Sequence, residues 1–249
     1  MALVYSPSIV KSGLVLALDA ADRNSYPGTG TRWYDISGNG LYGDINSGEF
    51  VSSSFGGYLQ NASNTSNFFH ISFPDFDKFY DTFSVTTGGW TIEEIIWTNS
   101  TNYPEADAGS VFSDAAYGAS QTGFDWNHGY GINQFQFAQS SNTAGSYEDA
   151  GQINVPSQYA QFNTWRMRTM IWNRTANLNS LYINGVSIGS INTPNTAGTS
   201  IYDHGTSYLG TLYGWKHYGR RASVKIYNRV LSQAEITQNY TAVKSRFGL

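Results

Sequence analysis

The chain of 249 residues contains no cysteine, which excludes disulfide bonds, thiolate metal sites and cysteine nucleophiles. Charged residues make up only 13% of it, about half of their share in ordinary soluble domains. The net charge is −4, and no cluster of basic residues occurs beyond Arg220-Arg221, so nucleic acid is not expected as a partner. The sequence also lacks a run of about 18 apolar residues, and we therefore expect no insertion into a membrane.

A secretory signal is missing as well. The N-terminus has no positively charged segment, and the apolar run at 14–18 is too short to form the central part of a signal peptide. We therefore expect the protein to be made in a cytoplasm. Its matches to the N-glycosylation motif then have no expected role as modification sites.

Aromatic residues, at 16%, and glycine, at 26 residues, are abundant instead. Apolar and polar residues alternate in several segments, most clearly at 89–97 and 165–172, and this pattern predicts β-strands. The Asn184-Gly185 pair lies between two such segments and predicts a hairpin with a two-residue turn. These patterns predict an all-β fold, in which two antiparallel sheets pack as a jelly-roll sandwich.

No linker or internal repeat divides the chain, so we predict a single sandwich domain over residues 13–249. Residues 1–12 are interrupted by Pro7 and are expected to form a weakly structured lead or arm. The end of the chain differs from the rest, because Ser232 and Glu235 have the spacing of a helix capping box. Ile236, Tyr240 and Val243 follow at helical spacing, and we predict a short C-terminal helix that docks through this apolar stripe.

Five sequence blocks lie in the order of a known family. The block at 227–236 (YNRVLSQAEI) resembles the closing signature of the laminin G-like branch of the concanavalin A-like lectin/glucanase superfamily. The blocks at 13–20, 25–28 and 33–40 resemble its opening segments, and the block at 181–186 resembles its late hairpin. The resemblance implies a concanavalin A-like sandwich but says much less about the ligand. The short lead makes this version similar to domains of structural proteins of tailed bacteriophages, which implies a virion as its location.

Glucanases of this superfamily carry three acidic residues that alternate along one strand. The nearest feature here is Glu93-Glu94, whose side chains should point to opposite faces of a strand and so cannot act together on one substrate. We expect Glu93 to pair instead with Arg166 or Arg168 on a neighbouring strand. The protein is therefore expected not to be an enzyme.

Calcium is the commonest cofactor that the resemblance implies, and oxygen ligands from loops would bind it. No candidate group has the spacing of a defined calcium loop, and turn formation by Asp19 and Asp35 is the alternative. Metal ligands therefore stay unassigned and calcium stays open. The candidate ligands are Asp19, Asp22 and Asn24 near the first strand, and Asp125 and Asn127 in a later segment.

Two aromatic segments, both expected in loops, combine rings that could stack on a sugar with polar groups that could bind its hydroxyls. The same rings could instead cover a protein interface. Within them we expect Trp126 to be partly exposed in the isolated monomer. The candidate ligand-binding residues are Phe124, Asp125, Trp126, Asn127 and Tyr130 in the first segment, and Tyr213, Trp215 and His217 in the second.

Three hypotheses for the function follow. The first is a non-enzymatic, lectin-like virion protein of a phage capsid or tail that binds surface glycans or neighbouring virion proteins. The second is a purely structural decoration protein that does not bind glycans, and the third is an atypical glycoside hydrolase. Association with further copies of the chain is compatible with the first two.

Overall fold

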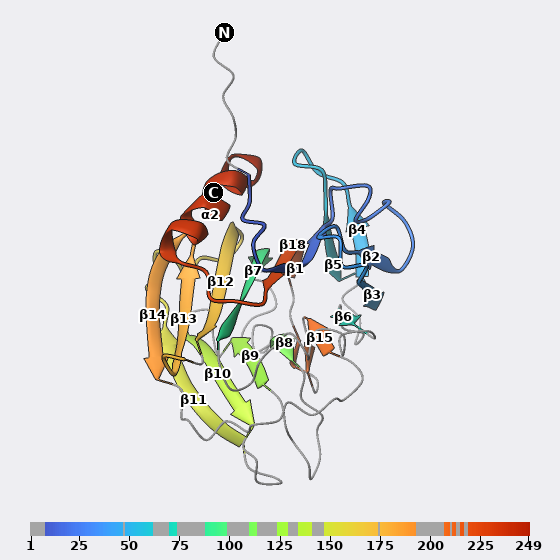
Figure 1. Ribbon diagram of the computed structural model, residues 1–249. Coiled ribbons are helices and arrows are strands. Elements are labelled where there is room, and N and C mark those ends of the chain that lie inside the picture. The colour runs from blue at the N-terminus through green and yellow to red at the C-terminus, as the bar shows by residue number, and fades with distance from the viewer. Residues whose placement is uncertain are drawn as a thin grey trace.

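The computed structural model describes residues 8–46, 48–61, 70–73, 88–98, 110–113, 124–128, 134–140, 147–173, 175–192, 207–209, 211–212, 215–216 and 219–249. These residues are mainly β-strand and include one helix, α2 (Gln233–Phe247), near the C-terminus. They form two eight-stranded antiparallel sheets (Figure 1). The predicted all-β, two-sheet sandwich with a short C-terminal helix is confirmed.

The first sheet has the strands predicted most clearly from alternation at its centre. Asn184 and Gly185 join two of its strands with φ angles of 51° and 77°, the left-handed turn that this pair favours. The strand order is β14 (Val186–Asn192), β13 (Leu178–Ile183), β12 (Trp165–Asn173), β7 (Gly89–Thr98), β18 (Gly219–Tyr227), β5 (Tyr58–Asn61) and β4 (Gly48–Val51), with β1 (Leu14–Asp19) paired to β18.

The second sheet is built mainly from shorter strands. Its order is β11 (Tyr147–Asn154), β10 (Gln134–Ser140), β9 (Phe124–His128), β8 (Ser110–Ser113), β15 (Ser207–Leu209), β6 (His70–Phe73), β3 (Tyr42–Asn46) and β2 (Arg32–Tyr34). A separate two-stranded sheet consists of β16 (Thr211–Leu212) and β17 (Trp215–Lys216).

Two segments that were predicted as loops contain strands. Residues 124–128 form β9, which pairs with β8 and β10, and residues 215–216 form β17. The sequence carries a signal for β9, because aromatic and polar residues alternate along it with the period that strands favour.

The main hydrophobic core lies between the two sheets. Leu16 of β1, Ile92 of β7 and Met170 of β12 contribute to it from the first sheet, and Phe135 of β10 from the second. Trp33 of β2 belongs to the same cluster and is fully buried. Apolar burial of this extent is the dominant favourable contribution to folding, and it fixes which face of each strand points inward.

Helix α2 covers the opposite, outer face of the first sheet. Ile236 packs there with Leu231 and Tyr227, and Phe247 packs further along with Met167. The predicted capping box is present, and Gly248 ends the helix with a φ of 68°. No helix in the described part of the chain is long and apolar enough to cross a membrane.

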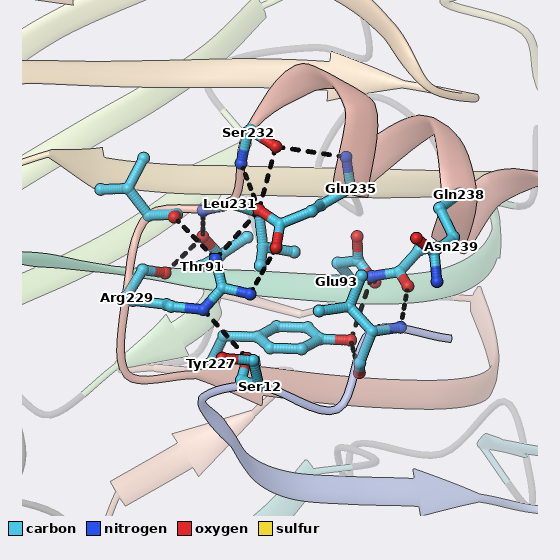
Figure 2. A network of polar contacts seen from close by, with 12 residues as sticks. Ser12, Thr91, Glu93, Tyr227, Arg229, Leu231, Ser232, Glu235, Gln238 and Asn239 are labelled. Carbon is cyan, nitrogen blue, oxygen red and sulfur yellow. Dashed lines mark hydrogen bonds and ion pairs between the residues drawn. The ribbon is translucent and has the colours of Figure 1, made fainter. Parts of the chain in front are cut away.

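Residues 8–12, the described part of the predicted lead, lie against this helix (Figure 2). The Val10 N–H donates to Asn239 Oδ1 at 2.7 Å, and the Tyr227 hydroxyl donates to the Val10 carbonyl at 3.2 Å. Arg229 Nε donates to the Ser12 carbonyl at 3.0 Å. The segment just before β1 is thereby tied to both β18 and α2, while the boundary proposed at residue 13 stays a prediction.

Candidate functional site

The two adjacent glutamates of β7 point to opposite faces of the first sheet, as predicted. Glu94 lies between the sheets, where Arg168 Nε of β12 donates to its Oε1 at 2.7 Å. Arg221 Nε of β18 donates to its Oε2 at 3.1 Å. All three side chains are buried, with at most 1% exposed. These contacts hold the Glu94 carboxylate from both neighbouring strands.

The predicted pairing of Glu93 with Arg168 is wrong. The register places Arg168 directly opposite Glu94, and directly opposed residues of an antiparallel pair share one face. Arg166 lies on that inner face too, where its Nη2 donates to Thr98 Oγ1 at 2.8 Å. The sequence showed the alternation of each strand but not the register between the strands.

Glu93 lies on the outer face, beneath α2 (Figure 2). Its Oε2 accepts a hydrogen bond of 2.9 Å from Asn239 Nδ2 of the helix. Burial raises the pKa of the Glu93 carboxyl from its ordinary value of 4.5 to about 7, although the charge of Lys225 and the bond from Asn239 oppose the rise. Glu93 is therefore a buried carboxyl group whose protonation state is coupled to the packing of α2 on the first sheet.

This coupling predicts a pH-dependent stability. The folded protein holds the Glu93 proton more tightly than the unfolded chain, so stability from this group is highest below pH 4.5 and falls as the pH rises through 7. Ionisation of Glu93 should lower the free energy of unfolding by about 3 kcal/mol as the pH rises from 4.5 to 7. Urea unfolding at a series of pH values should show this slope in the wild type and lose it in Glu93→Gln. Parallel pH profiles would contradict the prediction.

Neither glutamate is placed for glycoside cleavage. That reaction needs two carboxyl groups on either side of the same glycosidic bond. Glu94 is held by two arginines between the sheets and Glu93 is covered by the helix, each 1% exposed. This pair therefore cannot provide the acid and nucleophile on one substrate.

The proposed calcium ligands near β1 have other partners. Asp19 Oδ1 accepts from Arg246 Nη2 at 2.7 Å and from the Ala21 N–H at 2.9 Å. Asp22 Oδ1 accepts from the Asn24 backbone and side chain. A guanidinium on Asp19 does not fit a calcium site, and the described residues contain no cluster of three acidic or histidine side chains suited to a metal. The side chains of Asp125 and Asn127 lie outside the described residues.

The outer face of the second sheet carries two cross-strand pairs at its β2–β3 end. Arg32 lies opposite Asp44, and Tyr34 lies opposite Tyr42. Arg32 Nε is 3.4 Å from Asp44 Oδ1, and its guanidinium carbon lies 4.3 Å from the centroid of the Tyr42 ring. Tyr34 is 43% exposed, whereas Trp33 between the two outward residues is fully buried. Strand alternation thus presents rings and charges on one solvent-facing surface.

This face continues along the register of the second sheet. Asp44 lies opposite Ser72 of β6, and Asn46 Nδ2 donates to Ser72 Oγ at 3.1 Å. Position 72 is also paired with position 208 of β15, which is paired with position 113 of β8. Position 113 is in turn paired with position 125 of β9. The register therefore puts positions 125 and 127 on the face that carries Asp44.

The candidate ligand-binding residues from the sequence stay a prediction. The segment 124–127 lies in β9 and position 215 in β17, but their side chains lie outside the described residues, as do Tyr130, Tyr213 and His217 entirely. Position 126 is opposite 137, two residues from the buried Phe135. The expected partial exposure of Trp126 stays a prediction, because its side chain lies outside the described residues.

Sequence reasoning missed Arg32, Tyr34, Tyr42 and Asp44 as functional candidates. Their signal was present, because Arg32 and Tyr34 flank the apolar Trp33 in a period-two pattern that marks an exposed face. These residues belonged to a block used for the fold resemblance. Their juxtaposition depends on the pairing of β2 with β3, which alternation alone does not specify.

Comparison with solved structures gives matches over nearly the whole chain. The binding domain of botulinum neurotoxin DC in complex with rat synaptotagmin II matches with a TM-score of 0.67 and 16% identity, covering 94% of this chain and 52% of that one. A structure on cell entry of botulinum neurotoxin type C, dependent upon interaction with two ganglioside molecules, matches with a TM-score of 0.65 and 15% identity, covering 94% and 52%. The binding domain of Paraclostridial Mosquitocidal Protein 1 matches with a TM-score of 0.66 and 17% identity, covering 92% and 52%.

The chain spans about half the length of these structures, and at such low identity the likeness establishes the fold. No curated protein sequence matches the chain. Residues 69–237, more than half of it, match the profile of a laminin G family described as the concanavalin A-like lectin/glucanases superfamily. The protein is therefore a member of the concanavalin A-like lectin/glucanases superfamily.

Proposed function

We propose that the protein is a non-enzymatic, lectin-like domain that binds glycans on the outer face of its second sheet. The observation that carries this proposal is the exposed β2–β3 surface, where Tyr34 lies opposite Tyr42 and Arg32 lies opposite Asp44. The outer face of the first sheet is covered by α2 instead. The described β2–β3 end of the second sheet thus offers rings and charges to a partner.

The chemistry of this surface suits a sugar. An exposed tyrosine ring can pack on the apolar face of a pyranose, and carboxylate, guanidinium and amide groups can bind the surrounding hydroxyls. The Arg32 guanidinium forms an ion pair with Asp44 and lies over the Tyr42 ring, so the polar groups are already oriented before a ligand arrives. Asn46 and Ser72 provide further hydrogen-bonding groups on the same face, at a greater distance from the tyrosine rings.

Two further observations support a binding role without catalysis. The structural relatives include a binding domain of botulinum neurotoxin DC in complex with rat synaptotagmin II. They also include a structure on the cell entry of botulinum neurotoxin type C, which is dependent upon interaction with two ganglioside molecules. The glutamate pair nearest to a glucanase signature is divided between the interior of the sandwich and the underside of α2. We therefore propose recognition of glycans rather than their hydrolysis.

The setting that we propose is the surface of a virion, as part of a phage capsid or tail. This part of the proposal rests on the resemblance of the sequence blocks to domains of phage structural proteins. Neighbouring virion proteins or further copies of the chain would then be additional partners. We also keep as proposed contacts with a glycan or a neighbouring protein the candidate residues within the segment 124–130, together with Tyr213, Trp215 and His217.

A glycan array followed by calorimetry with the best ligand tests the proposal. Tyr34→Ala should weaken binding by about 1–3 kcal/mol, roughly five- to a hundredfold, because it removes one stacking ring. The free energy of unfolding should change by less than about 0.5 kcal/mol, since Tyr34 is exposed. Val186→Ala, at an exposed apolar residue of β14, is the control and should bind like the wild type.

Other outcomes would favour the rival functions. Binding to particle proteins without binding to any glycan would favour a purely structural decoration protein. Release of reducing sugar from a glycan by the pure protein would favour a glycoside hydrolase. An unchanged affinity in Tyr34→Ala would move the site away from the β2–β3 surface.

A further inference from the structure

Among the described residues, the buried cluster between the sheets has more positive than negative charge. Arg168 and Arg221 contribute two positive charges, and Glu94 contributes one negative charge. Each side chain is at most 1% exposed, so water compensates little of the excess. An uncompensated charge in such a place is costly, and arginine does not lose its proton in proteins.

Part of this cluster also has donors without acceptors. Arg168 Nη1 and both Nη1 and Nη2 of Arg221 have no hydrogen-bond partner among the described residues. Arg168 is partly compensated, because its guanidinium carbon lies 5.4 Å from the centroid of the Phe135 ring. Arg221 uses only Nε for Glu94, and its Nη1–Nη2 edge is the largest unmet donor group of the cluster.

The shape of that edge indicates the kind of ligand. Two parallel N–H groups on a guanidinium fit the two oxygens of one planar oxyanion in a bidentate arrangement. We propose that Arg221, supported by Arg168, binds one small monovalent oxyanion of the carboxylate type inside the sandwich. A small ion is required because the side chains that hold it are buried, and a single negative charge balances the excess of Arg168, Arg221 and Glu94. This site is independent of the proposed glycan surface, which lies on the other face of the second sheet.

Thermal unfolding in sodium formate tests the site. The protein is first dialysed into buffer with sodium gluconate, an anion too large for a buried position, and formate then replaces gluconate at constant ionic strength. Binding to the folded state alone should lower the unfolding equilibrium constant by about a hundredfold at a formate concentration a hundred times the Kd. Arg221→Met should lose this response. Arg23→Met, which removes an exposed arginine that donates to the Pro27 carbonyl, should keep it.

A second measurement decides the matter if Arg221→Met fails to fold. Wild-type protein incubated with ¹³C-formate should give one bound carbon resonance, distinct from free formate and saturating at one equivalent. Equal effects of formate and gluconate on unfolding, a retained formate response in folded Arg221→Met, or no bound resonance in the wild type would each overturn the proposal.

Discussion

Replacement of Glu94 by glutamine should lower the free energy of unfolding by about 3–5 kcal/mol, the usual cost of removing one partner of a buried ion pair. The carboxylate accepts from Arg168 on one strand and from Arg221 on the other, so the neutral amide would remove the negative charge that pairs with both guanidinium groups. Urea unfolding monitored by tryptophan fluorescence would measure the change. The denaturant dependence should stay the same, because the fold and the exposed area are retained.

Asp44→Asn is the matched control for this substitution. It makes the same chemical change in the Arg32–Asp44 pair, whose side chains are 52% and 38% exposed. An exposed pair of this kind contributes about 0–1 kcal/mol, because water screens both charges. Equal losses in the two variants would show that burial of Glu94 does not control the strength of its ion pairs.

Ile236→Asp should lower the free energy of unfolding by about 4 kcal/mol or more, because it removes a buried aliphatic side chain and introduces a carboxyl group in its place. Ile236 is fully buried on the outer face of the first sheet, in a cluster with Ile171, Tyr227 and Leu231. The loss should appear in both thermal and urea unfolding. Loss of helix docking would also expose Glu93, because Asn239 of the same helix covers this carboxyl group and donates to it.

Ser232→Ala separates the docking of the helix from its local stability. The Ser232 hydroxyl accepts from the Glu235 N–H, and the Glu235 carboxylate accepts from the Ser232 N–H at 2.9 Å. Loss of the cap should cost about 1 kcal/mol, as at other helix N-termini. Small and equal shifts for Ile236→Asp and Ser232→Ala would mean that α2 contributes little to holding the sandwich together.

The candidate site consists of residues from several strands. The rings of the segment 124–130 suggested a binding loop, but β9 pairs with β8 and β10 within a sheet. The exposed Tyr34–Tyr42 and Arg32–Asp44 pairs had no such density of rings in the sequence. A surface made of residues from several strands becomes visible only when the strands are paired.

Features that depend on residues close together in the chain could be predicted from the sequence alone. The Asn184-Gly185 turn, the Ser232–Glu235 capping box and the alternation of β7 all arise within about ten residues, where backbone geometry and hydrogen bonding are local. The opposite orientations of Glu93 and Glu94 followed for the same reason, since neighbouring side chains of a strand point to opposite faces.

Contacts between residues far apart in the chain depend instead on how the strands are ordered and paired. Glu94 binds Arg168, 74 positions away, and Arg221, 127 positions away, because β7 lies between β12 and β18 in one register. A shift of one residue in that register would exchange the inner and outer faces and move Arg168 away from Glu94. Strand order and register are set by the packing of the whole core, so the buried cluster and the exposed face of the second sheet could not be read from the sequence alone.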